Sequence, residues 1–235
     1  MNKLVVVRGG TKGIGRSIIE KFASQGFDIV TCSRKNDDLQ KLKQAIEQKN
    51  VGSNVFVHQA DMSVREEVKS FTDFVATLNR PVDVLVNNAG YFTPGEISTE
   101  ADGTLESMIN ANLYSAYYTT RGIVQGMKKQ RSGSVFNICS IASIKAYPNG
   151  GSYAISKFAL LGFSKCLREE LKEFGIRVTA VMPGATLTAS WAGVDLPPER
   201  FMKPEDVAET LYAAYILSNQ SVVEEIVIRP QLGDI

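Results

Sequence analysis

Two residues of the chain, Tyr153 and Lys157, have the types and the spacing that proton transfer requires. Side chains four residues apart share one face of an α-helix, so the phenol and the ammonium are neighbours if this segment is helical. An isolated phenol has a pKa of about 10, and a nearby ammonium favours the phenolate and lowers that pKa. Ser140, thirteen residues before Tyr153, adds a hydroxyl that can hydrogen-bond a reacting oxygen. The alternative for the pair is a solvated tyrosine and lysine on a helix surface.

A glycine-rich segment follows the first apolar run, and it reads Arg8-Gly9-Gly10-Thr11-Lys12-Gly13-Ile14-Gly15. Glycines let the backbone turn tightly and approach a pyrophosphate, whose charge is stabilised by free N–H groups at the start of the following helix. The spacing is not Gly-x-Gly-x-x-Gly, and the Gly-Lys-Ser/Thr triplet of a P-loop is absent from the sequence. The segment predicts a dinucleotide-binding loop, with a glycine-rich turn that binds nothing as the alternative. The expected contacts are Gly9, Thr11, Lys12, Gly13, Ile14 and Gly15.

The end of the second apolar run distinguishes between the two common dinucleotides. An acidic residue there binds the adenosine ribose hydroxyls of NAD and repels a 2′-phosphate. In this chain residues 32–35 read CSRK, and the first carboxylate is that of Asp37. Ser33, Arg34 and Lys12 can all bind a phosphate. We therefore expect NADP(H) in preference to NAD(H), the alternative being that Arg34 and Lys35 are solvated loop charges.

Short apolar runs alternate with helix-period stretches along nearly the whole chain. We expect strands at Leu4–Val7, Asp28–Cys32, Val55–His58, Val82–Val86, Ser134–Ile138, Arg177–Val181 and Glu224–Ile228. We expect helices at Ile14–Gln25, Asp37–Gln48, Val64–Leu78, Leu105–Gln130, Tyr153–Phe174 and Pro204–Leu217, with a capping box of Ser63 and Glu66 before the third. The strands are apolar on both faces, as parallel strands covered by helices on both sides require. The sequence predicts one α/β domain over residues 1–235 with a doubly wound, seven-stranded parallel sheet.

Composition and charge exclude several classes of protein. Of the 235 residues 44% are hydrophobic and 22% are charged, which is typical of a globular domain. Twenty-six Lys and Arg face 25 Asp and Glu, so neither nucleic acid nor a membrane surface is an expected partner. Nothing approaches the roughly 20 apolar residues of a membrane span. Three scattered cysteines (Cys32, Cys139 and Cys166) fit neither a disulfide framework nor a zinc site, and we expect a cytoplasmic protein without a metal.

These residues and their spacing resemble the short-chain dehydrogenase/reductase family over almost the whole chain. The resemblance rests on Asn87-Asn88-Ala89-Gly90 after the fourth expected strand, Asn112, Ser140, Tyr153-x-x-x-Lys157 and Pro183-Gly184. It implies a Rossmann-type fold, a nicotinamide cofactor and hydride transfer. In that scheme Tyr153 gives its proton to a carbonyl oxygen that Ser140 holds, and Lys157 holds the nicotinamide ribose. The residue that matches Asn112 anchors a water that connects the lysine to solvent.

The resemblance also implies cofactor contacts outside the glycine loop. They are Asp61 and Met62 at the adenine, Asn88, Ala89 and Gly90 after the fourth strand, and Pro183, Gly184, Thr186 and Thr188 near the nicotinamide. Each has a simpler alternative. Asn112 can bend a helix, Asp61 is favourable near a helix N-terminus, and the two threonines can belong to a turn that binds no ligand.

The sequence departs from the family pattern at both ends. Arg8 stands where the family usually has Thr or Ser, and its side chain either reaches a cofactor phosphate or packs against Asn87. The C-terminal segment 227–231 lacks the glycine-rich ending that many members use in tetramer contacts, so a homodimer is at least as good an expectation as a homotetramer. Cys139 and His58 also suggest a Cys/His nucleophilic site, although strand-end positions explain both of them.

The segment 185–203 lies where the family keeps its substrate-covering lid. It carries Trp191, Val194, Leu196 and Phe201, while Tyr91, Phe92 and Tyr147 follow other strand ends and Lys145 and Arg200 are the nearby cations. We expect a largely apolar pocket for a neutral ketone or aldehyde, for example a 3-oxoacyl thioester, with ordinary core packing as the alternative. Two other functions remain open at this point, a nucleotide-bound redox sensor with little turnover and an epimerase or dehydratase. Only about fifty residues follow Pro183-Gly184, which is short for the substrate domain of the latter.

Overall fold

The computed structural model describes residues 1–191 and 193–235, and its centre is a parallel sheet of seven strands. The strands are β1 (Leu4–Arg8), β2 (Asp28–Ser33), β3 (Val55–Gln59), β4 (Val84–Asn87), β5 (Gly133–Ile138), β6 (Ile176–Pro183) and β7 (Glu225–Ile228). Their order across the sheet is β3-β2-β1-β4-β5-β6-β7. All seven predicted strands are confirmed, and so is the doubly wound fold. Chain order reverses between β1 and β4, which is where such folds bind ligands.

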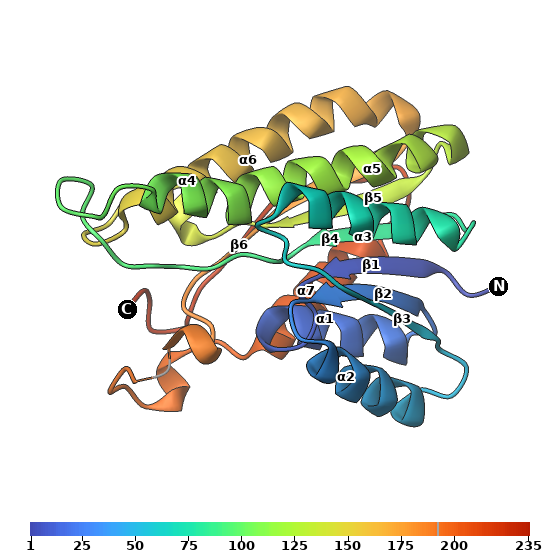
Figure 1. Ribbon diagram of the computed structural model, residues 1–235, viewed down its shortest axis with the longest axis horizontal. Coiled ribbons are helices and arrows are strands. Elements are labelled where there is room, and N and C mark those ends of the chain that lie inside the picture. The colour runs from blue at the N-terminus through green and yellow to red at the C-terminus, as the bar shows by residue number, and fades with distance from the viewer. Residues whose placement is uncertain (192) are drawn as a thin grey trace.

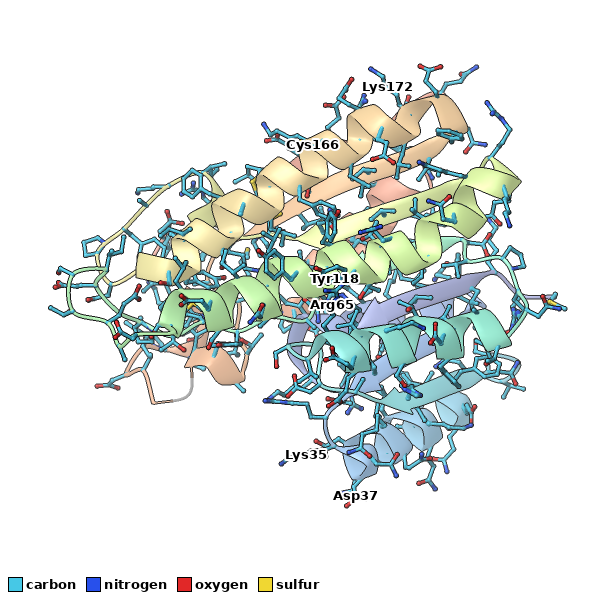
Figure 2. The ribbon with its side chains drawn as sticks, turned by 45° about the horizontal axis from the view of Figure 1, so that its top comes forward. Lys35, Asp37, Arg65, Tyr118, Cys166 and Lys172 are labelled. Atoms are coloured by element: carbon cyan, nitrogen blue, oxygen red, sulfur yellow. The ribbon has the colours of Figure 1, made fainter. Side chains whose placement is uncertain are left out.

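Helices cover both faces of the sheet, as the two-sided apolar strands require. One face carries α1 (Gly13–Ser24), α2 (Asn36–Lys49) and α7 (Pro204–Tyr215), and the other carries α3 (Arg65–Thr77), α5 (Ser115–Gln130) and α6 (Gly151–Leu171) (Figure 1). Each face has its own apolar core, centred on Phe22 in the first and Phe71 in the second. On the second face the Arg65 guanidinium lies over the Tyr118 ring at 4.6 Å and joins α3 to α5 (Figure 2). None of the described helices is both long and apolar enough to cross a bilayer.

The helix expected over Leu105–Gln130 is interrupted. It consists of α4 (Thr104–Ile109), a π-helical segment at Asn110–Tyr114 and α5. The Ser115 hydroxyl, at the start of α5, donates to the carbonyl of Ala111, and the π segment buries Ala111 and Asn112. π-Helical turns are rare and occur mostly at functional sites, because the extra residue reorients the side chains beside it.

The capping box predicted for Ser63 and Glu66 is wrong. Helix α3 begins after Val64 without a side-chain cap, and Ser63 instead donates its hydroxyl and backbone N–H to Asp61 Oδ1 at 2.7 and 2.9 Å. The Asp61 carboxylate therefore closes a turn before the helix, and it takes the Ser63 backbone N–H that Glu66 would have received in a capping box. The prediction of Pro204 in the first turn of the last helix is confirmed.

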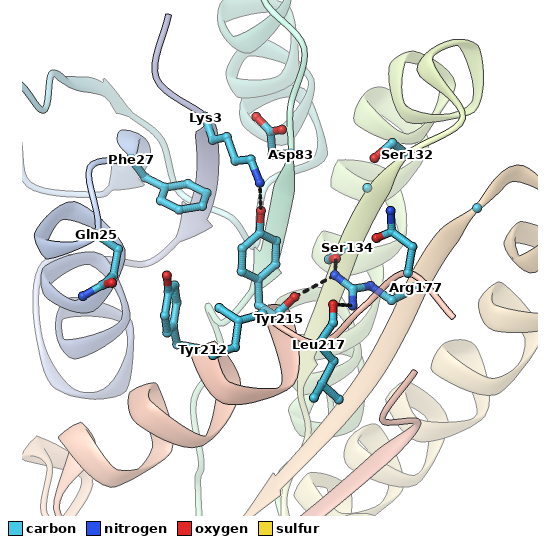
Figure 3. A pocket seen from close by; sticks show the side chains of 14 residues that line it. Lys3, Gln25, Phe27, Asp83, Ser132, Ser134, Arg177, Tyr212, Tyr215 and Leu217 are labelled. Atoms are coloured by element: carbon cyan, nitrogen blue, oxygen red, sulfur yellow. Dashed lines mark hydrogen bonds between the residues drawn. The ribbon is translucent and has the colours of Figure 1, made fainter. Parts of the chain in front are cut away.

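The amino-terminal edge of the sheet holds a cavity of about 540 Å³, far from the strand ends that the sequence marks as functional (Figure 3). Arg177 lies in it and donates to the carbonyls of Tyr215 and Leu217 at 2.8 and 2.9 Å, while Lys3 Nζ bonds the Tyr215 hydroxyl at 2.9 Å. The last carbonyls of a helix have no intrahelical partner, so Arg177 caps the C-terminal end of α7. These cations serve the structure of that edge.

Candidate active site

The side chains of Tyr153 and Lys157 lie on the face of α6 that is turned toward the sheet. Lys157 is 5% exposed, and its Nζ donates to the carbonyl oxygen of Ile138 at 2.9 Å. The same ammonium lies 5.6 Å from the centre of the Tyr153 ring. Burial is the main cause that lowers the pKa of Lys157 to about 8; Cys139 opposes this shift and the charge of Arg8 adds to it. Lys157 is thus buried and Tyr153 partly buried, so the alternative of a solvated surface pair does not hold.

The Tyr153 phenol faces Ser140, as the spacing predicts. Burial raises the pKa of the Tyr153 phenol, and the Ser140 hydroxyl lowers it only in part. The net direction is opposite to the sequence-based expectation, because Lys157 turns its ammonium toward Ile138 and not toward the phenol oxygen. The phenol is therefore protonated at neutral pH in this state of the protein, which is the form that donates a proton.

Ser140 is held by its own backbone. It caps a short 3-10 turn at Ile141–Ser143, and its Oγ accepts from the backbone N–H of Ala142 at 3.1 Å. Because this bond uses a lone pair of Oγ, the hydroxyl hydrogen is left to point at another acceptor. An oxygen placed between Ser140 and Tyr153 can thus receive two hydrogen bonds.

Asn112 connects three parts of the site. Its Nδ2 donates to Ser156 Oγ at 2.9 Å and to the Tyr91 carbonyl at 3.1 Å, and its Oδ1 accepts from the Tyr91 backbone N–H at 3.0 Å. The π segment therefore holds both α6 and the loop after β4. Gly90 completes the contact, because a Cβ on that residue would lie 2.6 Å from Asn112 Oδ1.

The glycine loop has the close packing that only glycine permits. Gly9 and Gly13 have φ of +71° and +55°, in the left-handed region that favours glycine. A Cβ on Gly15 would lie 2.3 Å from the Gly9 carbonyl oxygen and 2.4 Å from Asn88 Nδ2. Asn88 Nδ2 in turn donates to that same carbonyl at 2.9 Å. The loop is thus joined to the end of β4, and Ala89 packs against Gly9 from the same side.

Helix α1 begins directly after this loop at Gly13, and Lys12 precedes it without any side-chain cap. Its first N–H groups therefore point at the space above the loop, where a negative charge is favoured. Thr11 and Ile14 are partly buried beside them, and Thr11 Oγ1 lies 3.5 Å from Ser33 Oγ. These positions agree with a pyrophosphate-binding loop.

The ends of β2 and β3 bring Ser33, Arg34 and Asp61 together. The Gln59 side chain donates to the Arg34 carbonyl at 2.9 Å, which leaves the guanidinium exposed to solvent. Burial opposes ionisation of Asp61, but the Ser63 hydrogen bonds and the Arg34 charge outweigh it and lower the pKa of this carboxyl. Asp61 Oδ1 is thus used by the turn before α3, while the Met62 side chain packs into the second core.

The residues after β6 approach the glycine loop from the other side. A Cβ on Gly13 would lie 3.2 Å from Thr188 Cγ2, so the two loops are in contact. Thr186 is buried, and its hydroxyl donates to the Gly184 carbonyl at 3.0 Å. Gly184, which follows Pro183, donates its N–H to the carbonyl of Ile228 on β7. The candidate residues from β1, β2, β4 and β6 therefore surround one space at the carboxyl edge of the sheet.

The predicted lid over 185–203 is a loop whose base is closed by pairing of Thr186 with Met202. Trp191 packs on Phe201 with ring centres 5.2 Å apart, and Phe201 is buried. Of the lid residues proposed for a substrate pocket, Phe201 is therefore core, whereas Val194 is 44% exposed. Residue 192, within the same segment, lies outside the described residues.

Two aromatic residues expected near the pocket, Phe92 and Tyr147, lie beside Tyr153, whereas sequence reasoning missed the role of Ser156. Phe92 lies edge-on to Tyr153 with ring centres 4.9 Å apart. Desolvation and the nearby Tyr153 raise the pKa of Tyr147 to about 12. Ser156 follows Tyr153 by one helical turn, and its hydroxyl both receives the Asn112 bond and donates to the Tyr153 carbonyl at 2.7 Å. The spacing of Ser156 to Tyr153 was the only sign of its role in the sequence. Its bond to Asn112 joins residues 44 positions apart, so local sequence does not reveal it.

The alternative Cys/His nucleophilic site does not exist in the fold. Cys139 follows β5 and His58 lies on β3, so β2, β1 and β4 separate the two. Burial raises the pKa of Cys139 to about 11, which keeps the thiol protonated and unreactive. His58 instead stacks on Phe74 and bonds Ser70. No cluster of three metal-binding side chains occurs within residues 1–191 and 193–235.

A doubly wound sheet with a glycine loop at its reversal point and a Ser, Tyr and Lys cluster beside it defines a class of dinucleotide-dependent oxidoreductases. Comparison with known families shows which family of this class the chain belongs to. The short-chain dehydrogenase family model matches residues 3–197, and the chain belongs to that family.

Several relatives match along their whole length. Sepiapterin reductase of Chlorobaculum tepidum is 33% identical over 243 residues, which cover 100% of this chain and 99% of that protein. Among solved structures, an alcohol dehydrogenase of Thermococcus sibiricus complexed with 5-hydroxy-NADP has a TM-score of 0.91 at 27% identity, with 98% of this chain and 97% of that chain covered. L-Sorbose reductase of Gluconobacter frateurii, complexed with NADPH and L-sorbose, has a TM-score of 0.89 at 28% identity, with 97% and 95% covered.

Proposed function

We propose that this oxidoreductase reduces a ketone or aldehyde to an alcohol with NADPH, and that Tyr153 donates the proton. The observation that carries the proposal is the protonated Tyr153 phenol beside Ser140, with the buried Lys157 ammonium behind its ring. The complexes of the archaeal alcohol dehydrogenase with 5-hydroxy-NADP and of L-sorbose reductase with NADPH support the choice of dinucleotide.

The chain has the features that an NADP molecule requires. The left-handed Gly9 and Gly13, and the Gly15 position that a Cβ would fill, let the pyrophosphate lie against the backbone at the start of α1. We assign these contacts to Gly9, Thr11, Lys12, Gly13, Ile14 and Gly15. Arg34, Ser33 and Lys12 would hold the 2′-phosphate, and Asp61 with Met62 would border the adenine. Asn88, Ala89, Gly90, Pro183, Gly184, Thr186 and Thr188 would enclose the nicotinamide half.

The proposed reaction divides the work among four catalytic side chains. The bound dinucleotide supplies the hydride. Ser140 donates its hydroxyl hydrogen to the substrate carbonyl oxygen and holds it next to Tyr153. Tyr153 then gives its phenolic proton to that oxygen as negative charge develops on it. Lys157 stabilises the resulting phenolate and binds the nicotinamide ribose. Asn112, which holds the Gly90–Tyr91 loop, anchors a water through which Lys157 exchanges protons with solvent.

The substrate would be uncharged and at least partly apolar. Phe92 lies against Tyr153, Tyr147 is near it, and both rings are partly exposed where a substrate would enter. Sepiapterin and L-sorbose, the compounds named for two relatives, are uncharged carbonyl compounds and belong in the first panel together with a 3-oxoacyl thioester. A strong preference for free carboxylates would refute this part of the proposal.

The central test is NADPH oxidation with this panel, by wild type and by Tyr153→Phe. We expect turnover by wild type and a loss of at least about 100-fold in kcat for the variant, because general acid catalysis contributes that much. Binding of NADPH, followed by its fluorescence, should be retained in the variant. NADPH binding without turnover in both proteins would instead favour the redox-sensor function.

The cofactor preference has a separate test. Arg34→Glu inverts the charge where the 2′-phosphate would lie and should reverse the ratio of kcat/KM for NADPH and NADH in favour of NADH. Lys35→Glu is the matched control, since Lys35 is equally exposed but lies at the start of α2 (Figure 2). If both variants keep the same NADPH preference, the 2′-phosphate is bound elsewhere.

The protein would act as a single catalytic domain in the cytoplasm and as a homo-oligomer. The outer faces of α5 and α6 expose Tyr117, Ile155 and Phe158, and an apolar hollow of about 650 Å³ lies beside the last two. A homodimer through these helices buries such a surface. Sedimentation equilibrium of wild type and of Phe158→Glu distinguishes dimer, tetramer and monomer.

A further inference from the structure

Arg8, at the end of β1, is the largest completely buried side chain of the described residues and carries a charge. Its Nε donates to Asn87 Oδ1 at 2.9 Å, while Nη1 and Nη2 have no hydrogen-bond partner in the part of the chain that the structure describes. Burial lowers the pKa of Arg8 to about 10, so the guanidinium remains charged at neutral pH. A buried charge without a counter-ion costs free energy. Its retention therefore needs an explanation.

The bond to Asn87 is the first in a buried chain of hydrogen bonds that crosses the sheet. Asn87 Nδ2 donates to Asn137 Oδ1 at 2.7 Å, on the neighbouring strand β5. Asn137 Nδ2 donates to Ser164 Oγ at 2.8 Å, and Ser164 donates to the Leu160 carbonyl at 2.8 Å. The chain thus runs from β1 through β4 and β5 into helix α6.

Arg8 determines the direction of this chain. A guanidinium has donors only, so Asn87 must turn its oxygen toward Arg8 and its amide nitrogen toward Asn137. Asn137 must then accept with its oxygen and donate to Ser164. A neutral side chain that both donates and accepts would leave each amide free to rotate by half a turn. The buried charge also polarises the bonds that follow it.

The chain ends on the helix face that carries the catalytic side chains. Ser164 follows Lys157 by seven residues, which is about two helical turns and therefore the same face. Lys157 bonds the carbonyl of Ile138, and Ile138 directly follows Asn137. Two consecutive residues of β5 thus hold α6 at two points, one of which depends on Arg8. We propose that Arg8 is a positioning residue, whose guanidinium orients this hydrogen-bond chain and so fixes α6, with Tyr153 and Lys157, against β5.

The Arg8 charge also acts on Lys157 directly. The titratable groups that face Lys157 are Arg8 from β1, Cys139 from the end of β5 and Tyr153 from α6 itself. Cys139 and Tyr153 are neutral at pH 7 because burial raises both pKa values. The only neighbouring charge among these groups is that of Arg8, which disfavours the protonated lysine. Its removal should raise the pKa of Lys157 and move the alkaline limb of the activity profile to higher pH.

Two substitutions separate the two effects of Arg8. Arg8→Met removes both the donor and the charge at nearly constant volume. Arg8→Gln removes the charge and keeps a donor, since its amide nitrogen can occupy the position of Nε, but its carbonyl oxygen fixes the direction of the chain less strictly. Arg80→Met is the matched control, because Arg80 is a mostly buried arginine that pairs with Asp28 at the opposite edge of the sheet. Hydrogen exchange of the α6 amides is measured first, and it needs neither cofactor nor substrate. The kinetic measurements depend on the proposed carbonyl reduction.

We expect the α6 amides around Leu160 and Ser164 to exchange about tenfold faster in Arg8→Met than in wild type, and the increase to be smaller in Arg8→Gln. In Arg80→Met we expect no change in their exchange other than that caused by a lower global stability. We expect kcat of Arg8→Met to fall about 10- to 100-fold at nearly constant KM for NADPH. The alkaline limb should move upward in Arg8→Met and Arg8→Gln alike, and not in Arg80→Met. Unchanged α6 exchange in Arg8→Met, or equal effects in Arg8→Met and Arg80→Met, would overturn the proposal. A wild type without turnover would refute the proposed function and leave the exchange result to decide this one.

Discussion

Asn112 Nδ2 donates to Ser156 Oγ at 2.9 Å and thereby joins the π-helical segment to the catalytic helix α6. Asn112 Oδ1 accepts from the backbone N–H of Tyr91, so the protein makes three of the four hydrogen bonds that this amide can form. The π-helical turn is the reason that this side chain points inward, since it buries Ala111 and Asn112 together. The asparagine is therefore part of the framework of the site as well as a candidate anchor for water.

The first prediction concerns this framework. Asn112→Ala leaves the Tyr91 N–H and carbonyl without their side-chain partner and removes the donor to Ser156 Oγ, and an unsatisfied buried group costs about 1–3 kcal/mol. We expect urea denaturation to show a loss of stability in that range and kcat to fall by at least tenfold. Asn110→Ala is the control, because Asn110 belongs to the same π segment but is exposed. Equal losses in the two variants would mean that the segment, and not the Asn112 amide, is responsible.

Gly90 gives a second prediction, based on close approach. A Cβ there would lie 2.6 Å from Asn112 Oδ1 and 3.7 Å from Lys157 Nζ, so Gly90→Ala must displace Asn112. We expect this variant to lose about 1–3 kcal/mol of unfolding free energy and most of its activity.

Gly126→Ala is the control, and it should stabilise the protein. Gly126 lies within α5 with nothing within 4 Å of an added Cβ, and alanine is the better helix former by about 0.5–1 kcal/mol. A Gly126→Ala variant that is no more stable than wild type contradicts this reasoning.

The sequence predicted the sheet well because its information is local. Runs such as Leu4–Val7 and Val84–Val86 are apolar on both faces, and that pattern alone indicates buried parallel strands. The spacing of Tyr153 and Lys157 was also sufficient to predict that they share one face of a helix, because residues four positions apart in an α-helix lie on the same side. Glycines followed by a helix likewise indicated the loop at β1.

The features that sequence reasoning missed depend on contacts between distant segments. The π-helical turn at Asn112 follows no local propensity, and the pKa direction of Tyr153 depends on where the Lys157 ammonium points. Ser63 was expected to cap a helix but bonds Asp61, because its backbone N–H goes to the Asp61 carboxylate and not to that of Glu66. Arg8 was expected either at a phosphate or against Asn87, and only the packing of β1 beside β4 decides for Asn87. In each case a residue has two possible partners, and the distance between them along the sequence does not indicate which one it contacts in the folded protein.

The last prediction uses the burial of Lys157 as a measurable effect on stability. Burial lowers its pKa in the folded protein from 10.5 to about 8. Between these two values the unfolded chain holds a proton that the folded protein has released, so raising the pH favours the folded state. Below pH 8 the lysine is protonated in both states, and the cost of burying its charge is fully present. Lys157→Met removes that cost at every pH.

We therefore expect the stability of wild type relative to Lys157→Met to increase as pH rises from about 7.5 to 10, by roughly 1–3 kcal/mol, since one pKa unit corresponds to about 1.4 kcal/mol. Urea denaturation of both proteins across this range measures the difference. Tyr153 and Cys139 have raised pKa values and destabilise the fold at the alkaline end, but they do so in both proteins and largely cancel. Lys165→Met, an exposed position of the same helix, should not produce the increase. A flat difference for Lys157→Met would mean that the lysine is neutralised by a partner or hydrated in solution, and the proton path assigned to it would then have to be redrawn.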